Sequence, residues 1–171
     1  MIVVRNAEPH EYDAVAQIIL KSYEEYGPQL PEDGWQQYAR NILDVRSRMV
    51  ESELLVAVQD ETFVGSVTFY PTYMARVNSG WPQDWTGIRL VAVIPEYRGR
   101  GVGKAIMDEC IRRSRDQGAQ AVALHTTPYM TLAQGMYEHM GFVRIPGYDF
   151  HPRPDLTVMA YKLRLFLPPL P

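Results

Sequence analysis

The sequence predicts one α+β domain, with a mixed central sheet of about six to seven strands and about four helices against it. Two nearly continuous apolar runs, at 88–94 and 119–124, flank a helical segment, a pattern typical of a parallel strand–helix–strand unit. The segments 54–58 and 63–70 are separated by a polar turn and indicate a hairpin. A chain of 171 residues, which we take as a single domain over 1–171, is long enough to bury a core.

Composition narrows the classes of protein that fit. Hydrophobic residues make up 46% of the chain and charged residues 22%, which excludes a disordered polypeptide. The single cysteine, Cys110, excludes a disulfide framework and a cysteine-based zinc site, and predicts a reducing, cytoplasmic compartment. The sequence shows neither a bilayer-spanning apolar run nor the pattern of a signal peptide, so we expect no membrane partner.

Charge is unevenly distributed along the chain. Residues 1–71 contain five basic and twelve acidic side chains, whereas residues 98–115 contain six basic and two acidic ones. A local basic island in a chain of net charge −3 favours one small anionic partner over nucleic acid, which usually needs a broad basic face. The alternative is a solvated helix face with surplus arginines.

The first elements are a short strand at residues 2–4 and a helix that follows it. Pro9 suits the first helical turn, and Asn6 is a candidate for its cap. Apolar residues recur at helical spacing as far as Tyr23, and a Tyr-Gly-Pro segment then ends the helix. A second, looser helix is expected over residues 35–42.

The second half of the chain begins with an expected long loop at 71–87. The strand 88–94 follows, is ended by Pro95, and leads into a glycine-rich turn at 98–103. A helix with one apolar side extends from this turn to about Gln117.

Another helix is expected after the strand 119–124. Thr131 and Gln134 fit a capping box at its start, and Gly141 fits the left-handed position after its end. The expected apolar stripe of this helix comprises Leu132, Ala133, Met136, Tyr137 and Met140. Strands at 142–145 and 156–164, joined by a loop, close the sheet, and the proline-rich tail is expected to be extended.

The glycine-rich turn has the features of a phosphate site. A helix N-terminus carries unpaired N–H groups and a partial positive charge, and glycines let a phosphate approach the backbone. Arg98, Arg100 and Lys104 would add cationic donors. The spacing fits neither a dinucleotide fingerprint nor a P-loop, which disfavours a nucleotide-binding protein. The alternative is a strand–helix turn without a ligand.

Two motifs in a fixed order resemble a known family. Arg98-x-x-Gly101-x-Gly103 is followed by a helix, a strand and then Ala133-x-x-x-Tyr137-x-x-x-Gly141-Phe142. Over roughly residues 87–145 this arrangement resembles the GNAT family of N-acetyltransferases. The resemblance implies a GNAT-like acyl-CoA N-acyltransferase fold whose parallel strands splay apart, acetyl-CoA as co-substrate, and no metal.

The resemblance also implies which residues contact acetyl-CoA. The backbone of Leu90, Val91 and Val93 would pair with the pantetheine arm, and the N–H of Val91 would stabilise the oxyanion. Ala133 would be a small contact beside the pantetheine. N–H groups of the turn would hold the pyrophosphate, and these turn residues are Arg98, Gly99, Arg100, Gly101, Val102, Gly103 and Lys104.

Tyr137 matches the position where the family commonly places a general acid for the departing CoA thiolate. The alternative is an aromatic residue packed on the apolar side of its helix. Met130 stands where many family members have an asparagine, so a polar contact to the CoA arm is missing or replaced, for example by Thr127 or Thr131.

The sequence leaves the general base open among Asp84, Glu96, His125 and a chain of water molecules. The expected activity is acetyl transfer from acetyl-CoA to a primary amine of a small molecule or peptide, by direct attack in a ternary complex. The acceptor could be a polyamine, an aminoglycoside-like amine, an amino acid or a protein N-terminus. The alternative is a non-catalytic acyl-CoA-binding module of the same fold. The resemblance also allows a homodimer.

Overall fold

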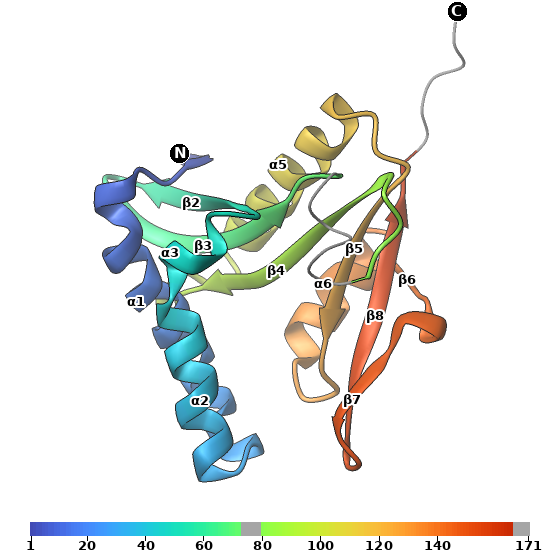
Figure 1. Ribbon diagram of the computed structural model, residues 1–171. Coiled ribbons are helices and arrows are strands. Elements are labelled where there is room, and N and C mark those ends of the chain that lie inside the picture. The colour runs from blue at the N-terminus through green and yellow to red at the C-terminus, as the bar shows by residue number, and fades with distance from the viewer. Residues whose placement is uncertain (73–79, 166–171) are drawn as a thin grey trace, which may run out of the picture. The chain divides into compact units, whose positions relative to one another are not determined.

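The computed structural model describes residues 1–72 and 80–165, and the chain divides into two compact units (Figure 1). Unit 1 comprises residues 1–69 and 90–110, and unit 2 comprises residues 70–89 and 111–171. Strand β4 (Trp85–Val93) and helix α5 (Val102–Asp116) each contribute residues to both units. Whether the chain behaves as the single domain expected from its length stays a prediction.

Unit 1 contains an antiparallel arrangement of β1 (Ile2–Asn6), β2 (Glu53–Gln59) and β3 (Thr62–Tyr70). The last part of β4 follows β3, and Ile94 N–H donates to the carbonyl oxygen of Val64 at 3.1 Å. The helices are α1 (Tyr12–Tyr23), α2 (Glu32–Leu43), the short α3 (Val45–Arg48) and the first part of α5. Three 3₁₀ segments connect them: η1 (Pro9–Glu11), η2 (Glu24–Gln29) and η3 (Pro95–Tyr97).

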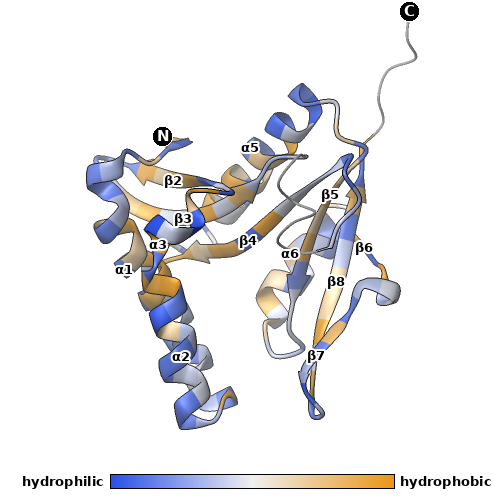
Figure 2. Cartoon of the chain, in the orientation of Figure 1, coloured by the Kyte–Doolittle hydropathy of each residue, from blue (hydrophilic) through white to orange (hydrophobic). Residues whose placement is uncertain are grey.

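Apolar side chains drive the packing of unit 1. Val15 and Ile19 of α1, Leu55 of β2, Val67 of β3 and Ile106 of α5 are fully buried. Figure 2 shows the apolar colour along the strands, whereas α2 is mostly hydrophilic except near its C-terminal end. In α1 the buried residues recur at helical spacing, whereas in β2 and β3 consecutive residues are buried, so both strands are covered on both faces.

The start of unit 1 corrects one expectation. Strand β1 extends through Asn6, so this residue is not the helix cap. Pro9 is the first residue of η1, as expected, but Glu8 precedes it as the cap. The Glu11 carboxylate accepts the N–H of Glu8 at 2.8 Å, so the capping hydrogen bond forms after the asparagine and not at it.

Unit 2 contains the parallel pair that the sequence predicted. The first part of β4 pairs with β5 (Ala121–Thr126) from Trp85–Ala121 to Ile88–Leu124. Strand β5 pairs antiparallel with β8 (Leu156–Arg164), and β6 (Val143–Arg144) lies beyond it. Strand β7 (Phe150–Arg153) also pairs with β8. Helix α6 (Thr131–His139) and the last part of α5 complete the unit.

The expected six to seven strands and four helices are close to the numbers in the described residues. Eight strands are present, of which seven follow one path and β7 lies off it. Parallel and antiparallel pairs are both present, so the sheet is mixed, as predicted. Within residues 1–72 and 80–165, each helix is either too short or too polar to cross a membrane.

Several boundaries in unit 2 differ from the expectations. Trp85–Gly87 belong to β4 and not to the expected loop, because they pair with β5. Residues 73–79 of that loop and 166–171 of the tail lie outside the described part of the chain. The expected loop after residue 145 contains η4 (Pro146–Tyr148) and β7, whose edge position tolerates a proline.

The predicted capping box of α6 is also wrong. Met130, and not Thr131, occupies the cap position. The side-chain amide of Gln134 donates instead to the carbonyl oxygens of Thr127 at 2.9 Å and Pro128 at 3.2 Å. Leu132 is 73% exposed and therefore does not belong to the apolar stripe.

Candidate functional site

The glycine turn of unit 1 has a backbone that requires glycine. Gly99 and Gly101 have φ angles of +73° and +84°, which side chains other than glycine rarely adopt. A Cβ atom at either position would meet nothing within 4 Å, so conformation and not crowding is the reason for glycine. The turn therefore presents bare backbone to solvent at the start of α5.

Unpaired N–H groups follow directly from this geometry. The N–H of Ala105 donates to the carbonyl oxygen of Gly101 at 2.9 Å, which is the first hydrogen bond of α5. The N–H groups of Val102, Gly103 and Lys104 precede it and have no acceptor within the helix. These donors and the positive end of the helix dipole suit a phosphate or pyrophosphate group.

The three cations of the turn differ in their surroundings. The Arg98 guanidinium contacts the carbonyl oxygens of Val93 and Ser22 and the carboxylate of Glu25. Arg100 is exposed and lies over the ring of Tyr97 at 5.1 Å. Lys104 is also exposed.

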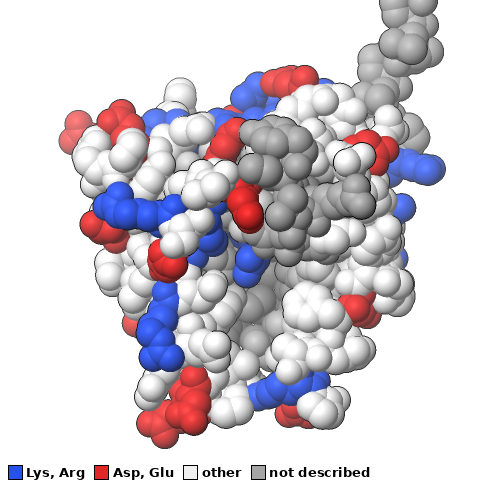
Figure 3. Space-filling model, viewed as in Figure 1, with Lys and Arg blue, Asp and Glu red and all other residues white. Residues whose placement is uncertain are grey.

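Arg100 and Lys104 therefore have the side chains that can turn toward a ligand at low cost. Lys104 Nζ lies 2.5 Å from Asp108 Oδ2 on the next turn of α5, in an exposed pair of the kind that is weak in water. Figure 3 shows Lys and Arg interspersed with Asp and Glu on the visible face. Arg98, by contrast, already has protein partners, and its N–H donates to Pro95 at 3.2 Å.

Strand β4 carries an unusual backbone where the pantetheine arm was expected. Leu90 has a φ of +54°, a strained conformation for a side chain with a Cβ atom. The hydroxyl of Tyr23 donates to the carbonyl oxygen of Val91 at 3.0 Å. Leu90, Val91 and Val93 thus lie in unit 1 with the turn, but the carbonyl groups of Val91 and Val93 already accept side-chain hydrogen bonds.

Gly65 of β3 is a site residue that the sequence analysis missed. A Cβ atom there would lie 2.7 Å from the carbonyl oxygen of Ala92 and 3.0 Å from Cγ1 of Val102. Glycine therefore lets β3 approach both β4 and the first turn of α5. A glycine inside a predicted strand was the available signal.

Ala133 and Tyr137 lie one turn apart on α6, in unit 2. Tyr137 is 4% exposed, and its ring lies 5.8 Å from that of Phe142. Gly141 has a φ of +92°, and the N–H of Phe142 donates to the carbonyl oxygen of Tyr137 at 3.0 Å. Tyr137, Gly141 and Phe142 of the second motif therefore together end α6 in a defined conformation.

Thr127 and Thr131, the residues expected to replace the polar contact missing at Met130, differ in burial. The Thr126 hydroxyl lies 3.7 Å from the Met130 sulfur. The Thr127 hydroxyl is buried and has no hydrogen-bond partner among the described residues, whereas Thr131 is exposed. Thr127 thus carries a spare donor just beyond the C-terminal end of β5.

The candidate bases differ in protonation. Glu96 lies 2.7 Å from Lys21 Nζ, and this contact lowers the pKa of the carboxyl group below its usual range. Asp84 is exposed and belongs to the loop before β4. Burial lowers the pKa of His125, so its ring is neutral near pH 7. A neutral imidazole accepts a proton more readily than an ion-paired carboxylate does.

His125 is held by aromatic side chains of unit 2. Its ring stacks on Trp81 at 4.6 Å and meets the edge of Phe150 at 5.0 Å. Trp81 also contacts the rings of Trp85 and Tyr148, at 6.1 and 5.3 Å. Trp81, His125 and Phe150 are far apart in the chain, so no local pattern indicates this cluster.

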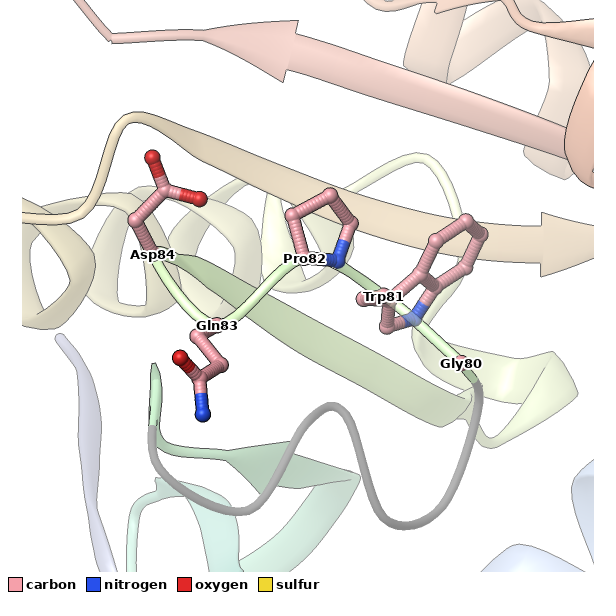
Figure 4. Close-up of a pocket in the computed structure, with 5 residues that line it drawn as sticks. All are labelled: Gly80, Trp81, Pro82, Gln83 and Asp84. Carbon is pink, nitrogen blue, oxygen red and sulfur yellow. The ribbon is translucent and has the colours of Figure 1, made fainter.

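An open hollow of about 580 Å³ lies on unit 2, at Gly80–Asp84 (Figure 4). Trp81 and Asp84 both belong to its lining, one apolar and one anionic. No group of His, Cys, Asp and Glu side chains that could hold a metal ion occurs among residues 1–72 and 80–165.

Comparison with known proteins agrees with the two motifs. Residues 12–142 match the model of the acetyltransferase (GNAT) family. N-acetyltransferase 8B of Homo sapiens is 34% identical over 96 residues, or 56% of this chain and 40% of the relative. The chain thus spans less than half of that relative's length.

Solved structures with the same fold include enzymes with bound cofactor. The PaiA N-acetyltransferase of Thermoplasma acidophilum, in complex with coenzyme A, has a TM-score of 0.73 at 16% identity, covering 95% of this chain and 99% of that one. A GNAT family acetyltransferase of Brucella melitensis, in complex with acetyl-CoA, has a TM-score of 0.66 at 20% identity, covering 100% and 92%. These similarities establish the predicted fold.

Proposed function

Because the chain belongs to the acetyltransferase (GNAT) family, we propose that it transfers the acetyl group of acetyl-CoA to a primary amine of a small molecule or peptide. The observation that carries this proposal is the glycine turn of unit 1, where N–H groups without helical acceptors begin α5. The cytoplasmic location stays a prediction, and the oligomeric state stays open.

The residues of the turn fit the phosphates of acetyl-CoA. The N–H groups of Val102, Gly103 and Lys104 would bind the pyrophosphate, and Arg100 and the Lys104 side chain would add charge. Backbone groups of Leu90, Val91 and Val93 would pair with the pantetheine arm, except for the carbonyl groups of Val91 and Val93, which already accept from Tyr23 and Arg98. Val91 N–H is the proposed oxyanion donor.

Direct attack in a ternary complex requires a neutral amine. An alkyl ammonium group has a pKa of about 10.4 and must lose a proton before it attacks. We assign His125 as the acceptor of this proton, because its neutral ring is a better base than the ion-paired carboxylate of Glu96. Attack forms the amide C–N bond and breaks the C–S bond, with the thiolate leaving.

Tyr137 is the proposed acid that protonates this thiolate. A phenol has a pKa of about 10 and an alkyl thiol one of about 8.5, so the transfer is uphill in water. Tyr137 is 4% exposed, and a thiolate that forms away from water is more basic. Ala133, one turn earlier on α6, would leave room beside the acyl arm.

The first experiment is thermal unfolding with and without acetyl-CoA. A ligand at about 100 times its Kd adds about 2.7 kcal/mol to the free energy of unfolding, which raises Tm by several degrees. A shift with acetyl-CoA that is weaker with adenosine supports the proposal and leads to thiol-release assays with a panel of amines. Absence of any shift at millimolar acetyl-CoA contradicts it.

Thiol release also separates an enzyme from a non-catalytic acyl-CoA-binding module. Stabilisation by acetyl-CoA together with amine-dependent thiol release supports acetyl transfer. Stabilisation without release by any polyamine, aminoglycoside, amino acid or peptide N-terminus would favour the binding module instead.

A further inference from the structure

We propose that Arg98 and Glu25 together position the glycine turn, and that Arg98 acts on acetyl-CoA through the backbone and not by touching its phosphates. This inference rests on the proposed function, since it concerns how the proposed cofactor site is held. Arg98 is the first residue of the glycine motif, and its charge alone would suggest a phosphate ligand.

The contacts of Arg98 reach three segments of unit 1. Its Nε donates to the carbonyl oxygen of Val93, at the end of β4, at 3.2 Å. Its Nη2 donates to the carbonyl oxygen of Ser22 in the last turn of α1 at 3.1 Å, and lies 2.5 Å from the Glu25 carboxylate in η2. A planar guanidinium can bond such separated acceptors at once, whereas an ammonium group cannot do so in a fixed geometry.

The position of Ser22 strengthens this attachment. Ser22 is 2% exposed, so its carbonyl belongs to a buried part of α1 and provides a fixed point. The C-terminal end of a helix carries a partial negative charge, which favours a nearby cation. The Arg98 side chain itself is 28% exposed, and burial makes its contacts stronger than those of a surface pair.

The glycine turn needs an anchor of this kind. Gly99 and Gly101 have no side chains, and no atom lies within 4 Å of where their Cβ atoms would be. Glycine loses more conformational freedom on ordering than other residues, so such a segment stays ordered only if its ends are fixed. Val102, 1% exposed, fixes one end, and Arg98 fixes the other.

Positioning and direct phosphate contact make opposite predictions for Glu25. If Arg98 binds phosphate directly, replacing Glu25 by glutamine frees the guanidinium and removes a negative charge, so CoA binds as tightly or more tightly. If the pair holds the turn, the same substitution loosens the backbone donors and weakens binding. Glu24→Gln is the matched control, because it removes the exposed carboxylate of the preceding residue in η2.

The test is isothermal titration of CoA into the wild-type chain and its variants, over a series of salt concentrations. We expect Glu25→Gln and Arg98→Gln each to raise the Kd about tenfold, and the double variant to be no weaker than Arg98→Gln alone. Arg98→Lys keeps the positive charge but loses the planar set of guanidinium donors, so its Kd for CoA is expected to resemble that of Arg98→Gln. The slope of log Kd against the logarithm of the salt concentration should stay unchanged in Arg98→Gln. It should decrease in Arg100→Gln, because that variant removes a charge from the proposed phosphate site.

Two results would overturn the inference. One is a Glu25→Gln variant that binds CoA as well as the wild type does, or better. The other is an Arg98→Gln variant whose salt slope decreases while Arg98→Lys retains wild-type affinity. Circular dichroism of each variant verifies folding, and Glu25→Gln, which alters an exposed carboxylate, tests the inference even if Arg98→Gln fails to fold. A wild-type chain that binds no CoA would refute the proposed function itself.

Discussion

His125 Nε2 lies 2.9 Å from the carbonyl oxygen of Tyr148, and this contact determines which ring nitrogen can accept a proton. A carbonyl oxygen only accepts hydrogen bonds, so Nε2 carries the hydrogen and Nδ1 is the acceptor of the neutral ring. The charged neighbours act in opposite directions, since Asp149 raises the pKa of His125 and Arg89 lowers it. Burial outweighs both and keeps the ring neutral.

The pH dependence of kcat/KM follows from this arrangement. The base must be neutral to accept a proton, and burial lowers the pKa of His125 below its ordinary value of 6.5. Activity should therefore persist below pH 6.5 and be lost only as the pH falls through this lowered pKa. His125→Gln should lower kcat/KM about a hundredfold and remove this acid limb. His151→Gln, on exposed β7, is the control. A His125→Gln enzyme with the wild-type profile would contradict the assignment.

Tyr137→Phe tests the general acid. The ring and its packing on Phe142 remain, so we expect the Kd for acetyl-CoA to stay unchanged. Loss of the hydroxyl should lower kcat about a hundredfold, because the thiolate then leaves unprotonated. Single-turnover thiol release measures this step, and Tyr12→Phe on α1 is the control. Unchanged turnover would make Tyr137 a packing residue only.

Gly65→Ala should destabilise the chain and the turn together. The added Cβ would lie 2.7 Å from the Ala92 carbonyl oxygen, so β3 must move away from β4 and α5. We expect the free energy of unfolding to fall by about 1–3 kcal/mol and CoA to bind more weakly. Gly135→Ala meets nothing within 4 Å in α6 and should stabilise by about 0.5–1 kcal/mol. Urea unfolding measures the free energy of unfolding of both variants. An equal change in Gly65→Ala and Gly135→Ala would refute the crowding argument.

Arg48→Met should loosen the end of α2. Arg48 is 9% exposed, and its guanidinium donates to the carbonyl oxygens of Asn41 and Ile42 in the last turn of α2 and of Asp44 directly after it. The carbonyl groups of a last helical turn have no acceptor role within the helix and need such donors. Loss of these bonds should lower the free energy of unfolding by about 2–3 kcal/mol. Arg46→Met, whose side chain is 60% exposed, should change it by less than about 0.5 kcal/mol, as measured by urea unfolding. Similar losses in both variants would show that burial is not the cause.

Local patterns explain how much of the fold could be predicted. Strand β8 has the bounds expected for it, and the helix after the glycine turn ends at Asp116, one residue before the expected Gln117. The left-handed conformation of Gly141, directly after a helix end, is the one expected from residue type. The helix N-terminus that forms the candidate phosphate site was therefore predictable, because its donors depend only on backbone that is local in the chain.

The remaining features depend on contacts between residues far apart in the chain. No local rule indicates that Tyr23 donates to Val91, that Arg98 reaches Glu25, or that Gly65 meets Ala92. The capping box at Thr131 failed for the same reason, since Gln134 bonds instead to carbonyls of the preceding loop.

The sequence alone determined the family, the order of the elements and the residues of the glycine turn, because spacing and residue type act locally. Tertiary structure decided what each polar side chain does. It engaged Arg98 with protein acceptors, placed Leu90 in a strained conformation and buried His125 against Trp81. The physical reason is that the bonding, strain and protonation of a side chain depend on neighbours that only packing brings within reach.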